Sequence, residues 1–157
     1  MADSQQTTEE IVTGSCLCKA IKYKATGKPV FTTICHCYNC RKSGGGPMAG
    51  SSIYPRAQVD IISGQDQIKV YNDAATDSGT SFDRQFCQNC GCQMFGSTKL
   101  AEQILAVYVG SLDPEYVNKW TPTNEQYCQT KAEFIPKLVE AGKGGRFVRS
   151  MMGPQVE

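Results

Sequence analysis

The sequence predicts a mainly β protein in which metal ions hold short sheets together, and three observations support this. Short runs of β-forming residues follow one another at a spacing of about 8–12 residues, separated by turns, as in all-β domains. No convincing 3.6-residue repeat of an amphipathic helix occurs before about residue 130. The chain of 157 residues contains nine cysteines, most of them in closely spaced groups.

The expected elements follow in order along the chain. The polar residues 1–12 predict a flexible N-terminal tail. Alternating or short apolar runs predict strands at 19–25, 30–34, 48–54, 59–62, 67–71, 80–86, 93–97 and 104–109. Residues 43–47 (Ser-Gly-Gly-Gly-Pro) are interpreted as a loop without helix-forming character, and 72–79 as a polar loop. We expect a single zinc-binding β domain over 13–140 and a loose tail over 141–157.

The overall charge does not favour a nucleic-acid partner. Sixteen basic and fifteen acidic side chains nearly cancel, and no basic block stands out. The first residues lack the basic and apolar regions of a secretory signal, and no apolar run approaches the ~20 residues that span a bilayer. We therefore expect a cytoplasmic protein without a membrane partner. The sequence leaves open whether two copies form a homodimer.

The spacing of the cysteines favours metal binding over disulfides. Their odd number prevents complete internal pairing, and such groups in a reducing compartment are typical of metal or redox chemistry. They form a C-x-C pair (16, 18), a C-x-C-x-x-C triplet (35, 37, 40), a C-x-x-C pair (87, 90) with Cys92 close behind, and a single Cys128.

The segment Cys87-Gln88-Asn89-Cys90-Gly91 has the form of a zinc knuckle. Two intervening residues let both sulfurs face one ion, and the glycine permits the tight backbone that follows. A closed site needs two more ligands. Cys16 and Cys18 can supply them, since residues i and i+2 share one face of a strand. Spacing alone also allows a site made from Cys16, Cys18, Cys35 and Cys37.

If the knuckle takes Cys16 and Cys18, the triplet lacks a fourth cysteine in its own segment. His36 is nearest, but it lies between two cysteines and is expected to face away from the metal as a packed residue. Cys92 and Cys128 are further candidates whose ordinary role would be that of a small buried thiol. The fourth position is thus a protein ligand or an open place for water or substrate.

The order G-x-C-x-C at 14–18, C-H-C-x-x-C-R-K at 35–42 and F-C-x-x-C-G at 86–91 resembles the glutathione-dependent formaldehyde-activating enzyme family, whose domain is shared with centromere protein V. The resemblance implies a β-tent fold and two zinc ions. It implies a structural zinc on Cys16, Cys18, Cys87 and Cys90, and a catalytic zinc on Cys35, Cys37 and Cys40 with one exchangeable position. The segment 121–134, which often helps wall the family's pocket, lacks the usual P-x-x-H-I-type motif here.

The family chemistry implies a carbon–sulfur lyase acting on a glutathione or other thiol adduct such as S-hydroxymethylglutathione. Candidate proton donors are Tyr38, Ser43, Ser51, Ser52 and Tyr54, and Arg41 and Lys42 are candidates to bind a glutathione carboxylate. Alternatives are another small molecule at the same open zinc, undergoing addition, elimination or isomerisation, and a non-catalytic zinc-stabilised binding module. A redox protein is a further alternative, against which the absence of a predicted helix after Cys40 or Cys90 argues.

Overall fold

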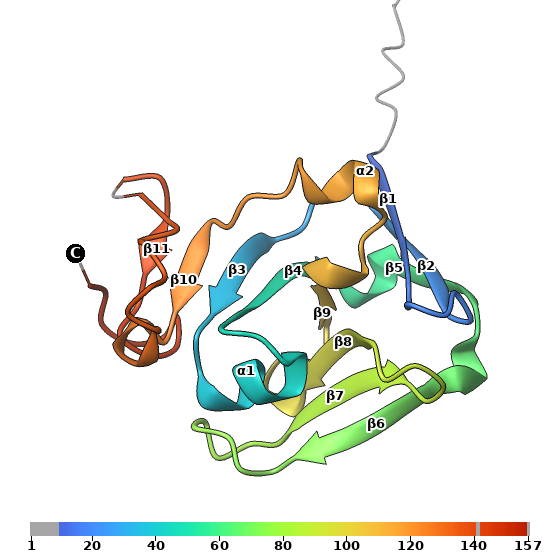
Figure 1. Ribbon diagram of the computed structural model, residues 1–157, viewed down its shortest axis with the longest axis horizontal. Coiled ribbons are helices and arrows are strands. Elements are labelled where there is room, and N and C mark those ends of the chain that lie inside the picture. Colours follow the sequence, from blue (N-terminus) through green and yellow to red (C-terminus); the bar gives the residue numbers. More distant parts are fainter. Residues whose placement is uncertain (1–9, 141, 157) are drawn as a thin grey trace, which may run out of the picture.

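The computed structural model describes residues 10–140 and 142–156, and two sheets build it (Figure 1). The smaller sheet has the strand order β1-β2-β5 and the larger has the order β11-β10-β3-β4-β9-β8-β7-β6. The strands are β1 (Ile11–Ser15), β2 (Lys22–Thr26), β3 (Phe31–Cys35), β4 (Ala49–Pro55), β5 (Val59–Ser63), β6 (Ile68–Asp73), β7 (Phe82–Cys87), β8 (Gln93–Thr98), β9 (Ile104–Tyr108), β10 (Asn124–Gln126) and β11 (Gly145–Arg146).

Helices are few and short. The α-helices are α1 (Tyr38–Gly44) and α2 (Pro114–Val117), and single 3-10 turns lie at Arg56–Gln58, Gln65–Gln67, Lys99–Ala101, Val109–Ser111 and Cys128–Thr130. In the part of the chain that the structure describes, no helix is long and apolar enough to cross a membrane.

The prediction of a mainly β fold with short antiparallel sheets is confirmed. Each of the eight expected strands overlaps an observed one. Most neighbouring strands pair antiparallel, for example β3 with β4 from Phe31↔Ile53 to Cys35↔Ala49. The exceptions are the two pairings of β10, which runs parallel to β3 on one side and to β11 on the other. These two short strands were not expected, because runs of two or three residues carry no periodic signal.

The core lies between the smaller sheet and the middle of the larger one. Tyr23 of β2 and Phe95 of β8 are fully buried and meet edge to face, with ring centroids 5.2 Å apart. Ile21, Ala25, Met94 and Val107 are also fully buried in it. The Tyr23 hydroxyl lies 2.9 Å from Ser111 Oγ, so its polar end is satisfied inside the core.

The expectation of a loop without helix at 43–47 is wrong in its first part, because α1 runs through Gly44. Two capping interactions explain this. The Cys37 side chain caps the start by accepting a hydrogen bond from the Cys40 amide at 3.3 Å. Gly45 caps the end in the left-handed region, at φ 66°, with its amide donating to the Arg41 carbonyl. The glycine-rich composition predicted that regular structure ends here, but it did not predict the helix that comes before.

A few residues of the expected C-terminal tail contact the rest of the domain, whereas 1–9 lie outside the described residues. Arg146 and Phe147 are buried, and Gly145 and Arg146 form β11 beside β10 (Figure 1). A side chain at Gly144 would place its Cβ 1.9 Å from the Thr123 carbonyl oxygen. The glycines that predicted looseness therefore permit a close approach of two backbones. At the other end, β1 begins within the expected 1–12 tail.

Candidate metal centres

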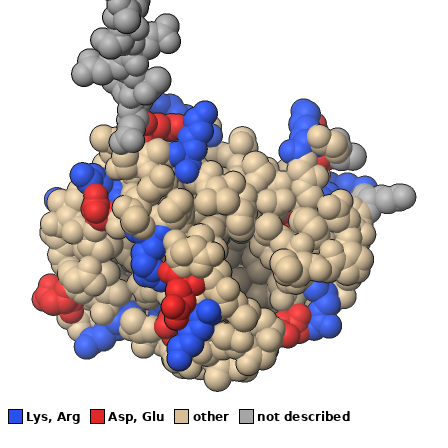
Figure 2. Space-filling model, turned by 180° about the vertical axis from the view of Figure 1, so that it is seen from behind, with Lys and Arg blue, Asp and Glu red and all other residues tan. Residues whose placement is uncertain are grey.

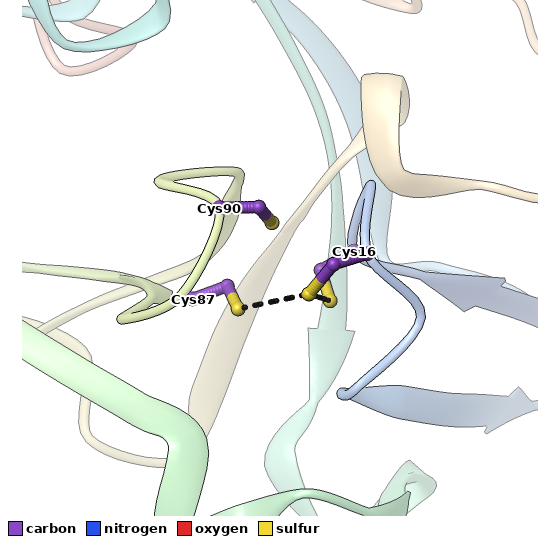
Figure 3. A group of neighbouring side chains, drawn as sticks. Cys16, Cys87 and Cys90 are labelled. Atoms are coloured by element: carbon purple, nitrogen blue, oxygen red, sulfur yellow. Dashed lines mark hydrogen bonds between the residues drawn. The ribbon is translucent and has the colours of Figure 1, made fainter.

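Four cysteines from two distant segments form the first cluster. Cys16 and Cys18 lie between β1 and β2, and Cys87 and Cys90 lie at the turn between β7 and β8 (Figure 3). Their sulfurs all lie within 4.8 Å of one another, with Cys16 to Cys18 at 3.5 Å and Cys18 to Cys87 at 3.7 Å. Tetrahedral bonds of about 2.3 Å to zinc would separate sulfurs by about 3.8 Å. The donor set therefore fits a closed zinc site.

The surroundings act differently on the four thiols, because burial raises the pKa of Cys87 to about 11 whereas hydrogen bonds favour the thiolate of Cys18. The Ile21 amide donates to Cys16 Sγ at 3.3 Å. Hydrogen bonds from the Asn89 side chain and the Ala20 backbone lower the pKa of Cys18 to about 6. Gly91, at φ 71°, allows the turn in which its own amide donates to the Cys87 carbonyl at 2.8 Å. This is the tight backbone that the knuckle pattern predicts.

The first cluster joins the two sheets. One pair of sulfurs belongs to the edge of the smaller sheet and the other to the β7–β8 turn of the larger sheet. Cys16 and Cys87 are buried at 2% and 0% exposure. An ion here would tie together elements about seventy residues apart, which is the position of a structural metal.

The second cluster contains Cys35, Cys37 and Cys40. Cys35 ends β3, Cys37 caps α1 and Cys40 lies in its first turn. Their sulfurs also lie within 4.8 Å of one another, and no fourth His, Cys, Asp or Glu of the described residues joins them. Within residues 10–140 and 142–156, the set of Cys16, Cys18, Cys35 and Cys37 that spacing also allows is not brought together.

The three thiols act strongly on one another. Hydrogen bonds from Cys35 and Cys40 lower the pKa of Cys37 to about 2, whereas the bonds to Cys37 and Cys40 raise the pKa of Cys35. Some of the three sulfurs thus keep their protons. A divalent cation would replace those protons, so the donor set fits a three-thiolate zinc site.

A cavity of about 450 Å³ opens over the second cluster. Its lining includes the three cysteines together with Ser51, Tyr108 and Tyr127. Tyr127 has φ 57°, a left-handed conformation that is uncommon for a bulky residue and is found mostly at functional sites. A volume of this size is ordinary for a small-molecule site.

Arg84 is a site residue that the sequence did not reveal. It lines the cavity from β7, and its Nε and Nη2 atoms donate to Asp73 Oδ2 at 2.9 and 2.8 Å. Its Nη1 donates to Ser43 Oγ at 3.1 Å, and the charge of Cys40 helps to raise the pKa of Arg84. The available signal was a charged residue inside the strand expected at 80–86. Asp73 falls in the polar loop expected at 72–79, whereas the structure places it at the end of β6.

The remaining candidates occupy varied places. His36, which lies between Cys35 and Cys37 in the sequence, is fully buried and does not belong to the sulfur cluster. Cys92 and Cys128 also lie outside both groups, and their Sγ atoms contact the carbonyl oxygens of Gln93 and Glu125. Of the candidate proton donors, Tyr38 and Ser51 line the cavity over the second cluster. The Ser43 hydroxyl accepts hydrogen bonds from the side chains of Arg84 and Gln93. Ser52 and Tyr54 line a separate cavity of about 260 Å³.

The expected absence of a helix after Cys40, which spoke against a redox protein, is wrong, because α1 begins directly after Cys37 and continues beyond Cys40. A C-x-x-C at a helix start is the arrangement of thiol redox sites. What distinguishes this site is Cys35, whose sulfur lies with the other two. Three clustered sulfurs match metal ligation more closely than a two-thiol exchange site does.

A mainly β domain with one sulfur cluster between its sheets and another at the base of a cavity defines a class of small cysteine-rich β proteins with donors for two metal ions. The sequence profile of the family described as glutathione-dependent formaldehyde-activating enzyme matches residues 11–130. This is most of the chain, and the protein belongs to that family.

Two individual proteins are similar to this chain. An uncharacterized lyase of Schizosaccharomyces pombe is 29% identical over 108 residues, which are 68% of this chain. The match spans only 65% of the yeast protein's own length. A crystal structure of a Rhodobacter sphaeroides protein shares the fold, with a TM-score of 0.52 and 19% identity, over 65% of this chain and 88% of that one.

Proposed function

We propose that the protein is a zinc-dependent carbon–sulfur lyase acting on a thiol adduct such as S-hydroxymethylglutathione. The observation that carries the proposal is the second cluster, in which three sulfurs face a cavity and no fourth protein donor among the described residues accompanies them. Catalytic zinc sites keep such a position free for water or substrate, whereas structural sites are closed. The family and the yeast relative's name as a lyase support this class of reaction.

Cys35, Cys37 and Cys40 would hold the catalytic zinc, and Cys16, Cys18, Cys87 and Cys90 would hold a structural one. A zinc ion at the first of these sites would supply a positive charge that keeps a bound substrate sulfur in its thiolate form at neutral pH. We place the reaction in the cytoplasm, where thiols of the glutathione class are kept reduced.

The reaction is balanced without an oxidant or reductant. In cleavage, the carbon–sulfur bond of the adduct breaks and its electron pair stays on sulfur. The hydroxyl group gives its proton to water and becomes the carbonyl of the aldehyde. In the reverse direction, the thiolate attacks the carbonyl carbon, and the carbonyl oxygen takes up a proton. The site must therefore hold a sulfur and serve an oxygen one carbon away.

Tyr108 is the group best suited to serve that oxygen. Burial and the neighbouring charges of Cys40, Cys35 and Cys37 raise its pKa, so the phenol keeps its proton. Tyr108 lines the cavity, and a protonated hydroxyl can donate a hydrogen bond to an oxygen that gains charge. Arg84 lies beside Cys40 and would offset the negative charge of the thiolates.

The proposal is tested with cobalt in place of zinc, because sulfur-to-cobalt charge-transfer absorption increases with each bound thiolate. Glutathione should increase this absorption in the wild type, and adduct turnover should be measurable with zinc. Cys37→Ser should lose both effects while one metal equivalent remains at the other cluster. An unchanged spectrum with every small thiol tried would contradict the proposal and favour the binding-module alternative.

A further inference from the structure

The charges in the cavity wall bear on what kind of molecule enters it. Among the described residues, three charged side chains line the cavity: Asp77, Arg84 and Arg149. Arg84 donates from Nε and Nη2 to the single oxygen Asp73 Oδ2 and from Nη1 to Ser43 Oγ, and it lies beside Cys40. Arg149 forms an ion pair with Asp77, which also accepts a hydrogen bond from the Tyr127 hydroxyl at 3.3 Å. Each arginine is therefore already paired with a protein carboxylate.

The rest of the cavity lining is uncharged and includes several apolar side chains. Ile53, Phe82, Ala106 and the ring of Tyr108 line it, and Leu100 lies toward its exposed part. Ser51, Gln126 and several threonines provide uncharged polar atoms. On the face shown in Figure 2, which is hollowed near its centre, Lys and Arg side chains are interspersed with Asp and Glu rather than collected in one cationic patch.

This composition conflicts with burying a whole glutathione molecule. Glutathione carries two carboxylates and one ammonium group, and burying an unpaired charge is costly. A carboxylate inside the cavity would have to compete with Asp73 or Asp77 for an arginine. It would also approach three cysteine thiolates whose combined charge exceeds that of one zinc ion. The cavity has the electrostatic character of a receptor for neutral groups.

We infer that the part of the substrate that enters this cavity is uncharged and mainly apolar. This inference rests on the proposed open site at Cys35, Cys37 and Cys40, since the sulfur of the substrate is placed there. A thiol adduct with an uncharged carbon body fits completely. A glutathione adduct fits with its carboxylates outside the mouth, where Asp77 and Arg149 are 36% and 55% exposed.

Three thiols distinguish these cases when they bind to the cobalt-substituted protein. The probes are glutathione, glutathione diethyl ester, which has the same thiol but no carboxylate, and phenylmethanethiol, which has no charge at all. Dissociation constants are taken from the charge-transfer band and corrected for the pKa of each free thiol. We expect the diester and phenylmethanethiol to bind at least about tenfold more tightly than glutathione, a difference of about 1.4 kcal/mol.

A variant that frees one arginine should change this preference. Asp77→Asn keeps a group that accepts a hydrogen bond from Tyr127 but leaves Arg149 without its carboxylate partner. We expect the preference for the diester over glutathione to fall about tenfold in this variant, because Arg149 can then pair with a substrate carboxylate. Asp60→Asn is the matched control. It frees Lys24 in the smaller sheet, away from the cavity lining, and should leave the preference unchanged.

The outcomes separate the two proposals. Equal or tighter binding of glutathione than of its diester, with a clear spectral change, would overturn the inference and leave the lyase proposal standing. The inference would also be overturned if Asp60→Asn changed the preference for the diester over glutathione as much as Asp77→Asn does. If none of the three thiols changes the spectrum, the open site itself is refuted.

Discussion

The side chains of His36 and Glu125 meet where neither is exposed, with Nε2 and Oε1 2.9 Å apart. Glu125 Oε2 also accepts hydrogen bonds from Arg146 Nε at 2.9 Å and from the Leu138 amide at 3.3 Å. The residue between Cys35 and Cys37 is therefore tied to β10, to β11 and to the segment between them. Burial lowers the pKa of His36 despite the nearby carboxylate, so the neutral ring donates its Nε2 hydrogen.

Removing the Glu125 carboxylate should destabilise the fold strongly. Glu125→Ala removes the buried carboxylate that pairs with Arg146 and accepts a hydrogen bond from His36. Breaking a buried ion pair in this way lowers the free energy of unfolding by roughly 3–5 kcal/mol. Glu125→Gln should cost less, because an amide still offers one acceptor. Urea unfolding of the metal-loaded proteins measures both, with the exposed Glu133→Gln as the control expected to stay near wild type.

The same carboxylate predicts a pH dependence. Burial raises the pKa of Glu125, but the hydrogen bonds from Arg146 and His36 outweigh it, and the net pKa is lowered. Its stabilisation is therefore complete above the unfolded-state pKa of about 4.3 and is lost as the pH falls through the lower folded-state value. The stability difference between wild type and Glu125→Gln should be constant from about pH 6 to 8 and narrow below about pH 4. A difference that widens with acid would contradict this.

The two sulfur clusters should respond differently to loss of one ligand. Cys87→Ser should unfold the domain or lower its melting temperature greatly, because structural zinc contributes on the order of 10 kcal/mol of apparent binding free energy. Cys37→Ser should remain folded and lose one zinc equivalent. Metal analysis and thermal melts of both variants decide this, and equal unfolding by both would refute the division into a structural and a catalytic site.

Neither Cys92 nor Cys128 should be needed to bind metal. Their sulfurs lie outside both clusters, and each contacts a backbone carbonyl instead. Cys92→Ala and Cys128→Ala should each keep the full zinc content. Loss of one equivalent in either variant would mean that the protein itself closes the fourth position at the triplet.

Arg84 should contribute to both stability and substrate binding. Arg84→Met leaves Asp73 buried without its cation, which costs roughly 3–5 kcal/mol. Arg84→Lys keeps the charge but loses the paired contacts, so it should be less destabilising yet still weaken thiol binding. Urea unfolding together with the cobalt spectrum separates the two effects. Wild-type stability in Arg84→Met would show that the Asp73 pair contributes nothing.

Local sequence determined the strands and the cysteine motifs. Alternation along β2, the turn at Gly91 and the spacing within each cysteine group depend on neighbouring residues, which is why they could be recognised without a structure. The family resemblance rested on the same motifs, and the match over residues 11–130 agrees with it. The loop predicted at 43–47 was wrong in its first part for a related reason, since a glycine can end a helix as well as mark a loop.

The tertiary structure decided which distant residues meet. Spacing allowed Cys16 and Cys18 to join either other group, and only the folding of the two sheets against each other brings them to Cys87 and Cys90. The pairing of β10 with β3 places Glu125 beside His36, and the β6–β7 hairpin places Asp73 beside Arg84. Such contacts depend on the packing of the whole chain, because a buried charge becomes stable only when its partner arrives from another element.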